Sequence, residues 1–94
     1  MRIVWSRRAA LHLTQARAYI SQNNPRAAKN IAQAIVAATD RLADFPNSGR
    51  PGRIPFSREL VIPGVPFILV YTVDDDRVEI LAVIHEARKW PESS

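Results

Sequence analysis

The sequence predicts an α+β fold: an N-terminal strand, then an antiparallel pair of helices packed on one face of a mainly antiparallel sheet of about four strands. Two segments in the first half carry apolar residues at helical spacing. Three runs rich in β-branched and aromatic residues follow in the second half, and a shorter run precedes the helices. We expect residues 1–94 to form a single domain, because a chain of this length buries one modest core.

The first two elements are a strand over residues 2–5 and a helix over residues 7–22. Ser6 precedes the helix and can cap it, because its hydroxyl accepts a hydrogen bond from a backbone N–H of the first turn. The apolar stripe of this helix consists of Ala9, Leu13, Ala16 and Ile20. His12 and Arg17 lie off the stripe, so we expect both to be exposed.

A second helix is expected from Pro25 to about Phe45. Asn24 can cap it, and proline suits the first helical position because no N–H is needed there. The inner face of this helix consists of Ala28, Ile31, Ile35, Ala38, Leu42 and Phe45. The alanines of both helices let them approach closely, which favours an antiparallel pair.

The second half of the chain predicts the sheet. Residues 46–57 are rich in proline and glycine and predict a loop. A strand over residues 58–62 follows, and then a hairpin whose strands cover residues 66–73 and 77–85. Three adjacent aspartates, residues 74–76, join these two strands. They predict a turn rather than a calcium site, because calcium requires spaced ligands and additional carbonyl oxygens.

The two faces of the last strand indicate where a partner binds. Strict alternation places one set of residues on a single face, which we assign to the core: Val78, Ile80, Ala82 and Ile84. Leu81 and Val83 then lie on the opposite face with Glu79 and His85. A partly apolar, uncovered face favours a protein partner. The alternative is that the C-terminal residues fold back over this face.

Composition excludes several classes of protein. The chain has no cysteine and only two histidines, far apart in sequence, so we expect no metal and no cofactor. No apolar run is long enough to cross a bilayer and the N-terminus has no signal-peptide core, so we expect a cytoplasmic protein. A net charge of +4, with 11 arginines among 13 basic residues, suits nucleic acid or an acidic protein partner. The codon usage of a GC-rich genome is an alternative explanation for the arginine excess.

Two groups of residues are candidates for function. His85, Arg88 and Trp90 follow the last strand, which brings a titratable group, a fixed cation and an aromatic ring to one edge of the sheet. Each also has a structural alternative: a hydrogen bond to neighbouring residues for the histidine, an internal ion pair for the arginine, and packing on the sheet for the tryptophan. The second group is a basic rim around the loop, or three separately solvated charges: Arg50, Arg53 and Arg58.

Short segments along the whole chain match a known family in their order and spacing. They are Ser6-Arg7-Arg8-Ala9, Tyr19-Ile20, Asn24-Pro25-Arg26-Ala27-Ala28, Leu42-Ala43-Asp44-Phe45-Pro46, Gly49-Arg50-Pro51-Gly52, Arg58-Glu59-Leu60, Ile68-Leu69-Val70-Tyr71, and residues 78–85 with Arg88-Lys89-Trp90-Pro91. In these segments the chain resembles the RelE/ParE superfamily of toxins from bacterial type II toxin–antitoxin modules. The resemblance implies a compact toxin that is neutralised by a small antitoxin. It also implies that the toxin–antitoxin pair contacts DNA through the antitoxin.

The resemblance implies one of two modes of action. RelE-like members cut mRNA in the ribosomal A site, whereas ParE-like members inhibit DNA gyrase and have no nuclease activity. RelE-like members carry basic residues where this chain has Glu59, Val61 and Ile68, which favours a ParE-like binding inhibitor. The alternative is a ribosome-dependent RNase with His85 and Arg88 as catalytic residues. In either case we expect the target to be contacted by Arg50, Arg53, Arg58, His85, Arg88 and Trp90.

The resemblance also implies how the antitoxin binds. Antitoxins of this class order an acidic C-terminal segment on the toxin and lay an amphipathic helix in a groove. We expect this groove between the alanine-rich helices and the uncovered sheet face, with Leu81 and Val83 in contact. Aspartate at either position is expected to weaken the complex without unfolding the toxin.

Overall fold

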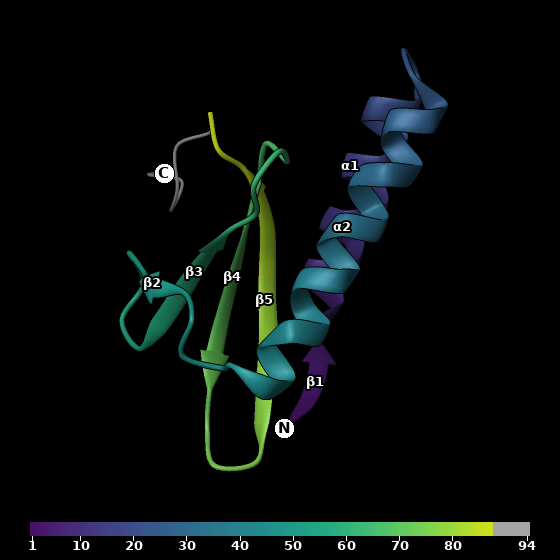
Figure 1. The fold of residues 1–94 in the computed structure, drawn as a ribbon. Coiled ribbons are helices and arrows are strands. Elements are labelled where there is room, and N and C mark those ends of the chain that lie inside the picture. The colour runs from purple at the N-terminus through teal and green to yellow at the C-terminus, as the bar shows by residue number, and fades with distance from the viewer. Residues whose placement is uncertain (88–94) are drawn as a thin grey trace.

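The computed structural model describes residues 1–87 and confirms the α+β class (Figure 1). In chain order its elements are β1 (Arg2–Trp5), α1 (Arg7–Ser21), α2 (Pro25–Asp44), β2 (Arg50–Pro51), β3 (Ser57–Val61), β4 (Phe67–Val73) and β5 (Arg77–His85). The strands form one sheet in the order β1-β5-β4-β3-β2. β1 is parallel to β5, and every other pair of neighbours is antiparallel.

The described residues thus form five strands rather than about four, because β2 lies inside the segment that we predicted as a loop. It is two residues long and pairs Arg50 with Glu59 and Pro51 with Arg58. Proline suits such an edge strand, since its missing N–H removes no bond from the interior of a sheet. Composition alone does not indicate a strand here.

Both helix starts follow the predicted caps. The Ser6 hydroxyl accepts a hydrogen bond from the backbone N–H of Ala9 at 3.0 Å. The side-chain oxygen of Asn24 accepts one from Ala27 at 3.0 Å, and Pro25 occupies the first turn of α2. Neither helix in the part of the chain that the structure describes is long and apolar enough to span a bilayer.

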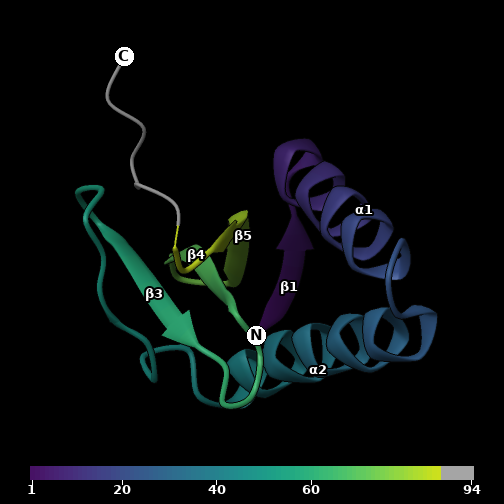
Figure 2. The same cartoon turned by 90° about the horizontal axis from the view of Figure 1, so that it is seen from above.

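The main core lies between the helices and one face of the sheet. In Figure 1 the two helices run side by side along one side of the strands, and Figure 2 shows β3 on the opposite side of the molecule from α1. The buried residues of this core are Ala9, Ala16, Ile35, Ala38, Leu42, Ile62, Val65, Phe67, Leu69, Tyr71, Val78, Ile80 and Val83. The strand β3 therefore presents a surface that neither helix covers.

A β-bulge in β5 places its last residues on other faces of the sheet than we predicted. Tyr71 pairs with Ile80 and Val70 with Ala82, so Leu81 is an extra residue on β5. An extra residue reverses the faces of all side chains that follow it. Val83 consequently joins the main core and is 4% exposed, and our prediction that it lies on an uncovered face with Leu81 is wrong.

The opposite face of the sheet also differs from our expectation. A second buried cluster lies there, consisting of Ile68, Val70, Ala82 and Ile84, each at most 4% exposed. Leu81 is partly buried and packs against this cluster. The middle of the face is therefore not the open surface that we expected.

The aspartate turn between β4 and β5 is confirmed. The backbone N–H of Asp74 donates to the carbonyl of Arg77 at 3.0 Å, and the Asp74 carboxylate accepts from the backbone N–H groups of Asp76 and Arg77. Desolvation raises the pKa of Asp74, but these hydrogen bonds outweigh it, so its pKa lies below the usual value. The carboxylate therefore acts as a turn residue.

Candidate functional site

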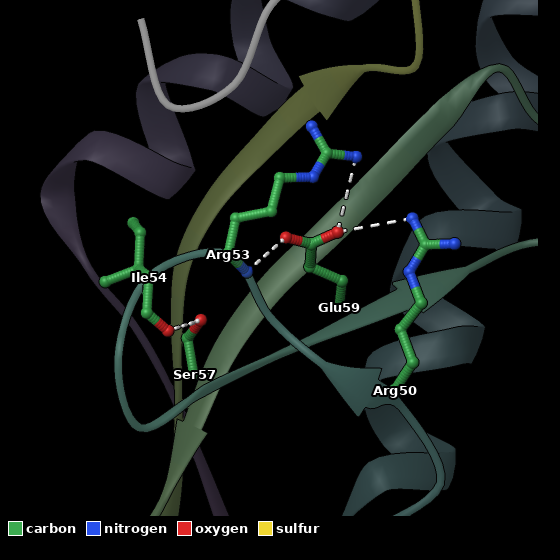
Figure 3. Close-up of polar contacts among 5 residues, drawn as sticks. All are labelled: Arg50, Arg53, Ile54, Ser57 and Glu59. Carbon is green, nitrogen blue, oxygen red and sulfur yellow. Dashed lines mark hydrogen bonds and ion pairs between the residues drawn. The ribbon is translucent and has the colours of Figure 1, made fainter.

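The first candidate site is built around Glu59, a buried carboxylate in the middle of β3. Its side chain is 1% exposed and lies on the face turned away from the helices, because it pairs with Val70. One carboxylate oxygen contacts Arg50 Nη2 at 3.2 Å and Arg53 Nη2 at 3.6 Å, and the other accepts from the backbone N–H of Arg53 at 3.0 Å (Figure 3). A buried charge is tolerated when it is paired and hydrogen-bonded in this way.

A buried hydroxyl holds the chain that leads into β2. The Tyr71 hydroxyl accepts from the backbone N–H of Gly49 at 2.8 Å and donates to the carbonyl of Pro46 at 2.8 Å. Arg58 Nη1 donates to the carbonyl of Gly49 at 2.8 Å. Residues 46–50 are thus attached to β3 and β4 by side chains.

These contacts divide the predicted basic rim. Arg50 and Arg53 are brought together by Glu59, and their side chains remain 52% and 44% exposed. Arg58 pairs with Tyr71 and so lies on the other face of the sheet, where it binds backbone carbonyls. The three arginines therefore form a pair and a separate structural residue rather than one patch.

The second candidate site is a pocket of about 530 Å³ between α1 and the end of β5. Both histidines of the chain line it. His12 Nδ1 accepts from the backbone N–H of Val83 at 3.2 Å, and His85 Nδ1 accepts from Ala87 at 3.1 Å. The other lining residues are Gln15, Ala16, Tyr19, Phe67, Val83 and Ala87.

His12 is a site residue that sequence reasoning missed, since we expected it to be exposed. Its side chain is half-buried against β5 because it accepts the N–H of Val83, two residues after the bulge. The bulge has no signature in the sequence, so the contact could not be predicted. His85 was expected at the strand end and lies there, with its ring edge-on to Phe67 at a centroid distance of 5.3 Å.

The two candidate sites lie on opposite faces of the sheet. His85 pairs with Phe67, which belongs to the helix-side core, whereas Glu59 pairs with Val70 of the second cluster. Within residues 1–87, the imidazoles and the arginine pair do not converge on one point. Arg88 and Trp90, which we also predicted as site residues, lie outside the described residues.

The comparisons give close relatives over nearly the whole chain. The chain is 45% identical over 91 residues to "Putative toxin Y4kP" of Sinorhizobium fredii, covering 97% of this chain and 94% of that protein. It is 37% identical over 86 residues to toxin RelE2 of Caulobacter vibrioides, covering 92% and 96%.

Two solved structures share the fold. A chain of the chromosomal ParDE toxin–antitoxin system from Pseudomonas aeruginosa has a TM-score of 0.79 and 27% identity, covering 90% of this chain and 95% of that chain. The YoeB dimer from Staphylococcus aureus has a TM-score of 0.56 and 19% identity, covering 87% and 92%. The second likeness concerns the fold alone.

A family model described as the ParE toxin of the type II toxin–antitoxin system, parDE, matches residues 3–90. Together with the helix pair on a five-stranded sheet, this match identifies the protein as a toxin of a type II toxin–antitoxin module. The chain belongs to the ParE toxin family.

Proposed function

We propose that this toxin stops growth by binding an essential protein target, DNA gyrase being the first candidate, and that it does not cut RNA. A cognate antitoxin neutralises it in the cytoplasm. The observation that carries the proposal is the separation of the two histidines from the arginine pair on opposite faces of the sheet.

RNA cleavage requires a base, an acid and cations around one phosphate. Arg50 and Arg53 share the Glu59 carboxylate, which offsets part of their charge. Arg58 lies on the same face as His85, but their partners on β4, Tyr71 and Phe67, are four residues apart, about 13 Å along the strand. Arg58 therefore does not stand beside the His85 imidazole in a way that would serve one phosphate.

The alternative function is a ribosome-dependent RNase. Two observations favour it: His85 is exposed, and one relative carries the name RelE2. A ribosome could supply groups that the chain lacks. This alternative predicts that activity depends on His85 and Arg88.

The two functions are separated by a pair of assays on purified toxin. We expect no toxin-dependent cuts when primer extension is run on a defined mRNA with programmed ribosomes. We expect inhibition of supercoiling by purified DNA gyrase, which His85→Ala should weaken by no more than the loss of one target contact, because the ring is not catalytic. Ribosome-dependent cuts that disappear in His85→Ala and Arg88→Ala would establish the RNase instead.

An acidic antitoxin segment suits the charge of this chain. The net charge is +4, and exposed basic side chains line α1 and α2 at Arg7, Arg8, Arg17, Arg26, Lys29 and Arg41. A groove of about 810 Å³ runs between the helices, with Leu13 and Val36 among its apolar lining residues and Arg17 and Lys29 among its basic ones. We propose that the antitoxin segment binds along these helices and reaches Leu81, and that DNA is bound only through the antitoxin.

Aspartate at Leu81 and at Val83 is expected to give different results. Leu81 is partly buried beside the second cluster, so Leu81→Asp should leave the toxin folded and weaken antitoxin binding at least tenfold, about 1.4 kcal/mol. Val83 is 4% exposed in the main core, so Val83→Asp should unfold the toxin. This revises our expectation that both variants stay folded.

Calorimetric titration with the antitoxin and circular dichroism measure these two effects. Val61→Asp is the matched control, because Val61 is 46% exposed on the same face as Ile68 at the far end of β3. Unchanged affinity in Leu81→Asp would remove Leu81 from the interface. A folded Val83→Asp variant would contradict its position in the core.

A further inference from the structure

Phe56 combines an almost fully exposed aromatic side chain with a backbone conformation that is unusual for such a residue. Its side chain is 97% exposed, the largest exposed fraction among the large apolar residues of the described chain. Its backbone has φ +66°, the left-handed conformation, and no other non-glycine residue in residues 1–87 has a positive φ. A residue with a bulky side chain rarely adopts this conformation, because its Cβ crowds the backbone.

Hydrogen bonds inside the loop between β2 and β3 hold Phe56 in this conformation. The backbone N–H of Gly52 donates to the carbonyl of Ser57 at 2.8 Å, which closes the loop. The backbone N–H and hydroxyl of Ser57 donate to the carbonyl of Ile54 at 3.1 Å and 2.6 Å. A Cβ at position 52 would clash with the Ser57 hydroxyl, so a larger residue there would displace this hydrogen-bonded side chain.

The loop is also anchored at its base. The backbone N–H of Arg53 donates to the buried carboxylate of Glu59 at 3.0 Å (Figure 3). A strained residue persists where the surrounding contacts determine it, and such residues gather at functional sites. The ring of Phe56 gains no burial in return for the strain, so the contacts of the folded chain do not explain this conformation.

We propose that Phe56 is an anchor that inserts into an apolar pocket on the folded protein target of the toxin. A rigid, exposed aromatic ring loses little conformational freedom on binding and buries a large area in a pocket. Arg50 and Arg53 have half-exposed guanidinium groups at the base of the same loop, so the pocket is expected to have an acidic rim. This inference rests on the proposed function and adds the residue that contacts the target.

The chemistry of the loop favours a folded protein over the other partners. An acidic, disordered antitoxin segment brings no preformed pocket to receive a single projecting ring. Nucleic acid would stack on the ring, but Ile54 and Pro55, which precede Phe56 in the loop, are apolar and offer no contact to a phosphate. An apolar loop tip matches a pocket on a protein surface better than a phosphate backbone.

Three variants of the full chain test this proposal. Phe56→Gly removes the ring and relieves the backbone, Phe56→Tyr keeps the ring, and Phe45→Ala removes another exposed aromatic side chain, 66% exposed at the end of α2. Each is induced in growing cells, and each is purified for melting, for inhibition of gyrase supercoiling and for binding to the antitoxin.

We expect Phe56→Gly to melt at a temperature no lower than the unaltered toxin, because glycine adopts positive φ without strain and the lost ring was exposed. We expect it to lose growth arrest and gyrase inhibition by roughly tenfold or more, with antitoxin affinity unchanged. Phe45→Ala should retain both activities, whereas Phe56→Tyr should retain them only in part, because its hydroxyl would enter an apolar pocket. If Phe56 had only a structural role, its loss would lower the melting temperature. Lost activity at an unchanged or higher melting temperature therefore indicates a contact with the target.

Four results would overturn the inference. Full growth arrest by Phe56→Gly would do so while leaving the proposed function intact. Equal loss in Phe45→Ala would assign the effect to exposed apolar surface in general. A selective loss of antitoxin binding, or of binding to a single-stranded oligonucleotide, in Phe56→Gly would assign the ring to that partner. If the unaltered chain arrests no growth, the proposed function fails, and the inference fails with it.

Discussion

Alanine at both Arg50 and Arg53 is expected to destabilise the toxin by about 3 kcal/mol, because Glu59 would remain as a buried carboxylate without a counter-charge. The carboxylate is 1% exposed while both arginines cover it, so water that enters in their place recovers only part of the lost interaction. The expected loss lies at the lower end of the range for buried pairs, because the arginine side chains are about half exposed. Urea unfolding at neutral pH measures this loss as a change in midpoint at constant m-value.

Removing the charge from Glu59 in the same variant provides the control. Glu59→Gln added to the two alanine substitutions should recover most of the lost stability, because the amide is neutral and its oxygen can still accept the backbone N–H of Arg53. Such recovery would show that the uncompensated charge, rather than the loss of arginine packing, causes the loss. A double variant as stable as the unaltered toxin would mean that Glu59 is solvated.

Tyr71→Phe is expected to destabilise the toxin by about 2 kcal/mol, through the loss of one oxygen atom. Tyr71 is 0% exposed, and its hydroxyl holds the N–H of Gly49 and the carbonyl of Pro46. Gly49 is itself buried, so its N–H would be left without an acceptor. Because these bonds hold residues 46–50 to the sheet, hydrogen exchange at Gly49 should accelerate along with the loss of global stability.

Tyr19→Phe is the matched control for this prediction. Tyr19 is 68% exposed on α1, so the same chemical change there should alter stability by no more than about 0.5 kcal/mol. Equal effects at the two positions would contradict a specific role for the Tyr71 hydroxyl. Gly49→Ala should disturb the same contact from the other side, because a Cβ at that position would lie 2.7 Å from the Tyr71 oxygen.

The parts of the fold that depend on local chemistry could be predicted from the sequence. Ser6 and Asn24 mark the helix starts because a cap needs only a side-chain acceptor three residues before a backbone N–H. The aspartates before Arg77 mark a turn for a similar reason. Each of these signals acts within one turn of the chain, so no tertiary information is needed to interpret it.

The bulge at Leu81 could not be predicted, because it depends on how β5 pairs with β4. Residues 80–84 are all apolar, so the reversal of faces leaves no local mark in the sequence. One error in register explains both the misplaced Val83 and the missed contact of His12.

The candidate site was predicted in part. The proximity of Arg50 and Arg53 was expected from their place in one loop, but the carboxylate that joins them was not. Glu59 follows Arg58 in the same strand, so the burial of its carboxylate could not be predicted from the residues around it. Phe56 gave no sign, because neither its exposure nor its backbone conformation can be derived from composition.

The position of β5 between β1 and β4 determines when the sheet can be completed during synthesis. Among the described strands β1 is synthesised first, yet Arg2 pairs with Arg77 and Trp5 with Ile80, so its partner is the last of these strands. Until β5 emerges, β1 has no neighbour in the sheet and β4 lacks one of its two neighbours, and closing so long a loop is slow. An unfinished chain therefore cannot assemble the sheet, and a message interrupted before β5 yields no folded toxin. The topology thus delays completion of the sheet until β5 has been synthesised.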